Sequence, residues 1–327
     1  MFEEARKLLE TTIPTSVGKP FLANPAAKEF EFNKENFSPI NTEASFSVAG
    51  VDSGSVTVFS APGVSVGFVR TFYNVFKNLQ RLRQEKKDFL VVTKLVPKGG
   101  EAFLESVVLP FQESELPLKE HLVLNASDSS LVLKGFRAMP SAMTPVVRKY
   151  LEWIACKQAS KHADLVVKDG SLATSATNES FYAKQFFEAD CKKSALSKTC
   201  SLVTDTGLSL TSAVNKLSPK GKWVYSRVYE NQKEDFDFFV VKLHDNARHC
   251  FRFEYLKNQD CLNNSLSNLA QYSRDSGFLG YPYVLVDADN NGRVSRKEAD
   301  VINSLLQSSL LSDELLSLNA HDELDLV

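Results

Sequence analysis

The chain has 327 residues, of which 43% are hydrophobic and 24% charged, and its formal net charge is -2. This balance is typical of a globular protein with a buried core, and it argues against a strongly basic nucleic-acid coat while leaving room for a local basic channel. No apolar run approaches the ~20 residues that span a bilayer, and the N-terminal MFEEARKLLE is a charged amphipathic helix rather than a signal sequence. We therefore expect a cytoplasmic protein with no membrane contact. The five cysteines are widely spaced and form no CxxC pair, which predicts reduced thiols rather than a zinc site or a disulfide framework.

The sequence divides into three parts of different character. After the N-terminal helix, residues 14–30 are rich in Pro, Gly and small side chains, as is typical of an extended arm that contacts a partner. We predict an N-terminal helix and arm over residues 1–43, a single α/β domain over 44–309, and an acidic C-terminal tail over 310–327.

The α/β domain begins with β-type sequence and then alternates between helices and strands. Apolar alternation or short apolar runs predict its first strands at residues 44–51, 55–61, 64–76, 89–96 and 102–109. A long helix over 140–161 then leads directly into a buried strand within 163–171. Beyond it we predict helices at 179–191, 264–275 and 295–311, and strands at 223–229, 236–244, 249–255 and 281–286. This order indicates a mixed or antiparallel sheet.

Several carboxylates occupy positions that suit a metal site. Asp52 in VDSGS is expected where a strand ends or bends, and Asp169 in VKDGS ends a buried strand. One such motif is more often a plain turn than a site, but two at strand ends favour a functional role. Glu152 lies on the helix before Asp169, where a solvated helix face is the simpler interpretation. Together with Asp287 or Asp289, these groups offer the oxygen ligands that Mg²⁺ and Mn²⁺ prefer when they activate water against a phosphodiester.

The stretch VDADNNGRVSRKEAD also matches the ligand pattern of an EF-hand calcium loop over residues 287–298. Counted from position 1, the matching residues at positions 1, 3, 5, 6, 9 and 12 are Asp287, Asp289, Asn291, Gly292, Ser295 and Glu298. An EF-hand requires a helix before its loop, but the predicted element there is the strand that ends at residue 286, and no second hand occurs. The residue types at 287–298 therefore fit a Ca²⁺ site, but the strand predicted before them does not favour one.

Several segments, taken in order, resemble the NurA nuclease family. They span about residues 45 to 305 and read GVDSGS, YLEW with DLVVKDGSLA, ALSKTCSL, FFVVKLHDNARHCFRFEY and GYPYVLVDADNNGRVSRKEA. The resemblance implies an RNase-H-like α/β fold, a mixed sheet flanked by helices, and a homodimer. It also implies an Mn²⁺-dependent (or Mg²⁺-dependent) 5′–3′ exonuclease and endonuclease that processes the ends of single- and double-stranded DNA while docked on a hexameric HerA-type ATPase.

The resemblance assigns roles to particular residues. Asp52, Glu152 and Asp169 match the family's acidic metal ligands, and Tyr281 matches the tyrosine of its GYP motif, which would position the scissile phosphate or water. Family members usually carry a histidine eight residues after that tyrosine, but this chain has Asp289. An aspartate still binds Mg²⁺ or Mn²⁺ through oxygen, although it cannot act as an imidazole ligand or acid.

The resemblance also reinterprets the calcium-like stretch and leaves alternatives open. Ser295 and Glu298 would form a capping box at the start of the last helix. Lys198 in SKT could contact a substrate phosphate or an acidic ligand, and a surface lysine at a strand edge is an equally good interpretation. Two other functions remain in competition with an active nuclease, namely a catalytically weakened structural or DNA-guiding subunit of a translocase and a calcium-binding module.

Overall fold

The computed structural model describes residues 1–12, 14, 16–21, 27–41, 43, 45–132, 135–226, 228–231 and 233–310. The acidic tail predicted from the sequence lies outside these residues from position 311 onward. Helices are present at α1 (Phe2–Thr12), α2 (Met143–Ala159), α3 (Glu179–Phe187), α4 (Leu210–Leu217), α5 (Leu262–Gln271), α6 (Tyr283–Gly292) and α7 (Arg296–Leu310). Among the described residues, no helix is long and apolar enough to cross a bilayer.

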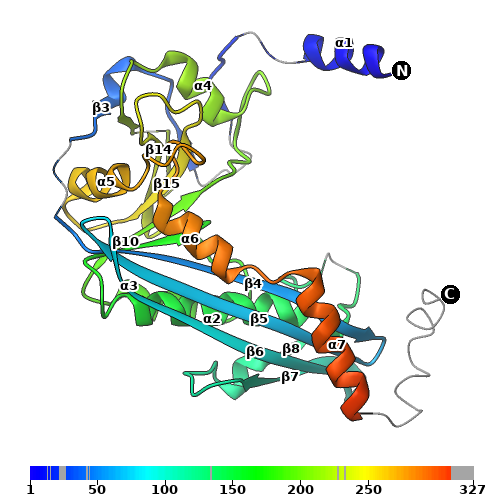
Figure 1. The fold of residues 1–327 in the computed structure, drawn as a ribbon. Coiled ribbons are helices and arrows are strands. Elements are labelled where there is room, and N and C mark those ends of the chain that lie inside the picture. The colour runs from blue at the N-terminus through cyan, green and yellow to red at the C-terminus, as the bar shows by residue number, and fades with distance from the viewer. Residues whose placement is uncertain are drawn as a thin grey trace.

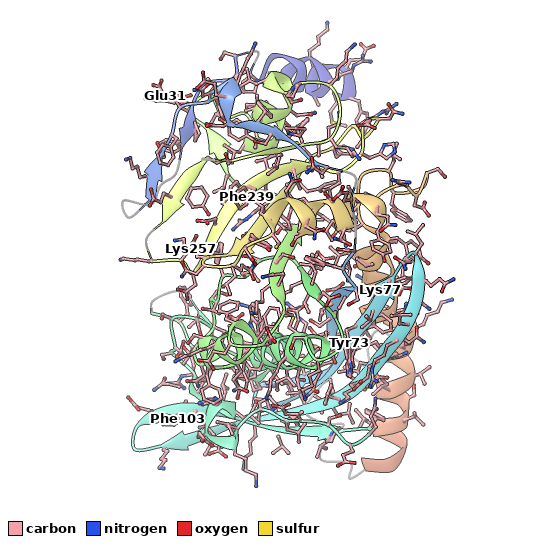
Figure 2. The ribbon with its side chains drawn as sticks, turned by 90° about the vertical axis from the view of Figure 1, so that its left-hand side faces the viewer. Glu31, Tyr73, Lys77, Phe103, Phe239 and Lys257 are labelled. Atoms are coloured by element: carbon pink, nitrogen blue, oxygen red, sulfur yellow. The ribbon has the colours of Figure 1, made fainter. Side chains whose placement is uncertain are left out.

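A single eleven-stranded sheet organises most of the chain. Its strands are β3 (Phe37–Pro39), β4 (Val48–Ala61), β5 (Val64–Lys77), β6 (Gln80–Lys98), β7 (Glu101–Pro110), β8 (Val123–Asn125), β9 (Leu165–Asp169), β10 (Lys192–Ser197), β12 (Trp223–Tyr225), β14 (Phe236–Lys242) and β15 (Phe251–Leu256). They lie in the order β3-β12-β14-β15-β10-β9-β4-β5-β6-β7-β8 (Figure 1). Of the strand pairs that the structure describes in this sheet, β4–β9 and β9–β10 are parallel and the others are antiparallel. Figure 2 shows the extent of the sheet, with Phe239 of β14 in the upper part and Phe103 of β7 in the lower part.

The N-terminal segment contributes strands of its own. β3 forms the edge of the large sheet by pairing with β12. Two further short pairs are present, one between β1 (Pro20–Phe21) and β11 (Val203–Thr204) and one between β2 (Ala27–Glu29) and β13 (Tyr229–Asn231). The segment before residue 40 is thus tied by backbone hydrogen bonds to the part of the chain near residues 203–231.

Strand β4 corrects one prediction about the first aspartate motif. The sequence suggested two strands, 44–51 and 55–61, with a turn between them at Ser53–Gly54–Ser55. Instead β4 runs unbroken through Asp52, because β5 pairs with it almost from end to end. Cross-strand hydrogen bonds along a long hairpin override the turn preference of Ser and Gly. Asp52 therefore lies in the middle of a strand.

Helices cover both faces of the sheet. α2 packs on β4 and β5 from one side with α3 beside it, while α6 and α7 lie across the opposite side (Figure 1). Because successive strand side chains point to opposite faces, Ala49 and Val51 enter the core beneath α2, whereas Val48 joins the core that includes α5 and α6. The residues of even number in this part of β4, including Asp52, thus face α6.

Helix α6 corrects a second prediction, since residues 281–286 were expected to form a final strand. Pro282 directly precedes the helix, and Val284, Leu285 and Ala288 are fully buried at helical spacing. A short apolar run such as Tyr283–Val286 fits a buried strand or a buried helix equally well, and periodicity over so few residues cannot separate them. The helix that enters the calcium-like stretch continues through its first six positions.

Candidate functional site

The parallel pairing of β4 and β9 brings the two aspartate motifs together. The register pairs Val51 with Lys168, so the next residues along the two strands, Asp52 and Asp169, are neighbours on the same face of the sheet. β9 ends at Asp169, while β4 continues beyond it. The carboxylates therefore meet where the parallel part of the sheet stops, which is where open α/β sheets commonly bind ligands.

Helix α6 supplies a third carboxylate, Asp289. Oxygen atoms of Asp52, Asp169 and Asp289 lie within 4.8 Å of one another. The helix can approach β4 this closely because the two flanking strand residues on that face are glycines. A Cβ atom on Gly50 would stand 2.3 Å from the Val284 carbonyl oxygen, and one on Gly54 would stand 2.4 Å from that of Gly292.

Burial and mutual repulsion shape the charge of this cluster. Burial, followed by the negative charges of Glu152 and Asp169, raises the pKa of Asp52 to about 7. Burial is also the main reason why the pKa of Asp169 is raised, although Lys198 acts in the opposite direction. Partly buried carboxylates that repel one another in this way are characteristic of sites that hold a cation.

Lys198 lies directly after the C-terminal end of β10, which is the strand next to β9. Its Nζ atom is 2.8 Å from Asp169 Oδ2 and 3.4 Å from Asp289 Oδ1, and it lies 5.3 Å from the centre of the Tyr281 ring. Burial alone would lower the pKa of the Lys198 amine, but the ion pairs with the two aspartates raise it. Its side chain is 42% exposed, so the amine borders both the carboxylates and solvent.

Glu152 lies beside the three aspartates but outside their group. This residue of α2 is 3% exposed, and its Oε2 atom is 3.0 Å from Lys168 Nζ and 3.8 Å from an Arg148 nitrogen. The simpler interpretation, a solvated helix face, is therefore wrong, while the metal-ligand role that the resemblance assigns to Glu152 stays a prediction. Its charge still contributes to the raised pKa of Asp52. Sequence reasoning missed Lys168, although a lysine inside an otherwise apolar buried strand signals a buried partner.

Tyr281 lies two residues before the start of α6 and borders the cluster. It is 6% exposed, its ring packs edge-on against Phe251, and its hydroxyl forms no hydrogen bond of normal geometry with the described residues. Burial, followed by the charges of Asp169 and Asp52, raises the pKa of this hydroxyl well above its usual value. Tyr281 is therefore a neutral donor held next to the carboxylates.

The calcium-like stretch does not form a calcium loop. Positions 1, 3 and 5 fall within α6, where residues two apart point to different sides of the helix, so their oxygens cannot surround one ion. Asp287 is buried against Asn74 and Arg81, while Asp289 faces Asp52. At the start of α7 the Glu298 carboxylate accepts from the Ser295 backbone N–H, and the Glu298 N–H donates to the Ser295 hydroxyl, which confirms the predicted capping box. A helix, not the expected strand, precedes this stretch, and the calcium interpretation fails because the helix separates the oxygens.

Comparison with known proteins identifies the fold. The sequence matches no family model and no curated protein. Among solved structures, the NurA nuclease from Sulfolobus solfataricus superimposes with a TM-score of 0.53 at 13% identity, over 94% of this chain and 93% of that chain. The chain has a NurA-like fold. Human ENDOV (TM-score 0.40, 12% identity, 82% of this chain and 94% of that chain) and Ciona intestinalis endonuclease V (0.39, 11%, 79% and 87%) are more distant.

The NurA-like fold confirms the RNase-H-like mixed sheet flanked by helices that the sequence resemblance implied. The predicted residues Asp52, Asp169, Tyr281 and Asp289 come together beside the C-terminal ends of the central strands β9 and β10, with Lys198 next to them. Residues that lie more than 100 positions apart in the chain thus form one site.

Proposed function

We propose that the protein is a metal-dependent deoxyribonuclease that hydrolyses DNA phosphodiesters at the Asp52–Asp169–Asp289 cluster. The convergence of three carboxylates within 4.8 Å at the C-terminal end of β9 in a NurA-like fold is the observation that supports this function most directly. The donor set consists of oxygen alone, which suits Mn²⁺ or Mg²⁺ better than softer metals.

These residues would hold the cation, and each neighbour has a distinct task. A divalent cation bound there would lower the pKa of a water molecule and offset the charge of the phosphodiester. Glu152 would add negative charge from the opposite face of the sheet. Its own charge is balanced there by Lys168. Lys198, partly exposed beside the cluster, is placed to contact a phosphate oxygen of the substrate. The neutral Tyr281 hydroxyl would orient the scissile phosphate or the attacking water.

The resemblance to the NurA family extends the proposal beyond the reaction. We infer 5′–3′ exonuclease and endonuclease activity on single- and double-stranded DNA, a homodimer, and a role in DNA end processing with a HerA-type hexameric ATPase. The sequence motifs support these inferences, together with the fold that the chain shares with the Sulfolobus nuclease.

A cleavage assay with a matched pair of variants tests the reaction. Labelled single- and double-stranded DNA is incubated with Mn²⁺, Mg²⁺, Ca²⁺ or EDTA. We expect cleavage with Mn²⁺ or Mg²⁺, none with EDTA, and at least a 100-fold lower rate for Asp169→Asn, because an amide is a poor ligand for the cation. Asp300→Asn, an exposed aspartate of α7, is the control and should cleave normally.

The outcomes separate an active nuclease from its competitors. Wild-type cleavage by a folded Asp169→Asn protein would remove Asp169 from the mechanism. A wild type that binds Mn²⁺ and DNA but cleaves neither substrate would instead identify a weakened, DNA-guiding subunit.

A further inference from the structure

A fully buried carboxylate, Glu254 of β15, lies outside the aspartate cluster. Its two oxygens accept hydrogen bonds from the Ser171 hydroxyl at 3.0 and 2.9 Å. Oε2 also accepts from the Leu172 backbone N–H at 2.6 Å, and Oε1 pairs with the Arg252 guanidinium. Every contact on Glu254 is a donor, so the ionised carboxylate is fully satisfied.

Two of the donors to Glu254, the Ser171 hydroxyl and the Leu172 N–H, belong to the turn that directly follows Asp169. Gly170 adopts φ +103°, a conformation that favours glycine, and its N–H donates to the Leu196 carbonyl at 3.1 Å. The Ser197 hydroxyl donates to the Gly170 carbonyl. Glu254 therefore anchors the far end of a turn whose near end carries a carboxylate of the candidate site.

The charge of Glu254 is difficult to explain by packing alone. A buried ion pair must overcome the desolvation of both partners, and apolar residues of similar volume often serve a core as well or better. Burial alone would lower the pKa of Arg252, but the adjacent Glu254 charge raises it, so the guanidinium stays ionised beside its partner. An ionised acceptor, unlike an apolar side chain, can hold two N–H or O–H donors of a turn in fixed positions.

We propose that Glu254 is a positioning residue for the nuclease site, which holds the Gly170–Leu172 turn and thereby orients the Asp169 carboxylate toward a bound cation. The proposal rests on the proposed function. Glu254 acts through Ser171 and Leu172, and a partner that orients a metal ligand in this way commonly changes metal affinity 10- to 100-fold when it is lost.

The test uses Mn²⁺ alone, without DNA, and removes one link at a time. Ser171→Ala deletes the hydroxyl that reaches Glu254, and Ser171→Thr restores one. By calorimetry we expect Ser171→Ala to bind Mn²⁺ about 10-fold more weakly than the wild type, and Ser171→Thr to recover most of that loss. The control is Ser267→Ala, which removes a buried serine hydroxyl whose partner is a backbone carbonyl within α5, away from the site.

Three further measurements separate positioning from simple destabilisation. Melting temperatures should agree within a few degrees among the serine variants. Glu254→Asp, one methylene shorter but still charged beside Arg252, should also weaken Mn²⁺ binding. In cleavage assays, Ser171→Ala should require about 10-fold more Mn²⁺ for half-maximal activity but approach the wild-type rate at saturation.

The results also distinguish this inference from the proposed function. If the wild type binds no Mn²⁺, the proposed function is wrong. If the wild type binds Mn²⁺ and the folded Ser171→Ala and Glu254→Asp variants bind it equally well, Glu254 has no positioning role and the proposed function is untouched. A loss of affinity in Ser267→Ala as large as that in Ser171→Ala would likewise refute the positioning role.

Discussion

Asp52 is an acid whose ionisation costs the folded protein stability. Burial, followed by the charges of Glu152 and Asp169, raises its pKa from 3.8 to about 7. A raised pKa means that the folded state binds the proton more tightly than the unfolded state. The resulting penalty is therefore absent below pH 4, grows as the pH rises, and is complete above pH 7.

We expect Asp52→Asn to stabilise the protein in the presence of EDTA. The amide carries no charge, so the gain should be about 1 to 3 kcal/mol at pH 8 and should fall toward zero at pH 4. Urea denaturation at the two pH values measures it. An Asp52→Asn protein equally or less stable than the wild type at pH 8 would contradict the electrostatic account of this cluster.

Asp289 and Glu298 should respond oppositely to substitution. Asp289→Ala removes one of the three clustered carboxylates, and we expect it to reduce Mn²⁺-dependent cleavage at least 100-fold. Glu298→Gln weakens a helix cap and an ion pair with Arg70, which costs on the order of 1 kcal/mol of stability while cleavage stays near normal. The rates and unfolding curves of the two variants provide the measurement. A micromolar Ca²⁺ site that disappears in Glu298→Gln would restore the calcium interpretation.

The position of helix α6 depends on the absence of side chains beneath it. A methyl group on Gly54 would collide with the backbone of Gly292, which cannot move without shifting Asp289 on the same helix. We expect Gly54→Ala to cost about 2 kcal/mol or more and to reduce cleavage strongly. Gly63→Ala is the matched control, because a Cβ atom there meets nothing within 4 Å. Equal stability and activity of the two variants would show that α6 tolerates displacement.

Helices and strands whose apolar residues recur with a clear period could be predicted from the sequence. The apolar spacing of α2 and the apolar run of β9 placed Asp169 at a strand end, as the structure has it. The sequence could not show that Asp52 lies within a strand, since that depends on the pairing of β4 with β5 across a distant turn. Likewise, only tertiary packing decides whether Tyr283–Val286 becomes a strand or a helix.

The sequence could identify residues of the candidate site but not the contacts between them. The family resemblance selected Asp52, Glu152, Asp169, Tyr281 and Asp289 as residues of one site, whereas spacing alone could not show which of them converge. Buried charge partners such as Lys168 and Glu254 depend on the register between strands. A single sequence contains no direct signal for that register.

The N-terminal helix is the element that we expect to bind another protein. α1 lies at the periphery of the molecule, with Phe2 and Leu8 84% and 66% exposed (Figure 1). We propose that it contributes to docking on a HerA-type ATPase, and we expect deletion of residues 1–12 to weaken that binding at least 10-fold without changing Mn²⁺ affinity. The deletion leaves β1 and its pairing with β11 intact. Interferometry with the purified ATPase measures the change, and unaltered binding would exclude α1 as the docking element.

The two faces of β4 belong to two different hydrophobic cores. Val48 packs in one core and Val51 in the other, and β5 pairs along nearly the whole strand. Neither core can open locally without breaking a strand that the other also requires. Backbone amides around Asp52 should therefore exchange with deuterium only through global unfolding, while the tip of the β5–β6 hairpin above Lys77 exchanges rapidly (Figure 2). The site should consequently keep its shape up to the melting temperature, so that thermal inactivation and unfolding coincide.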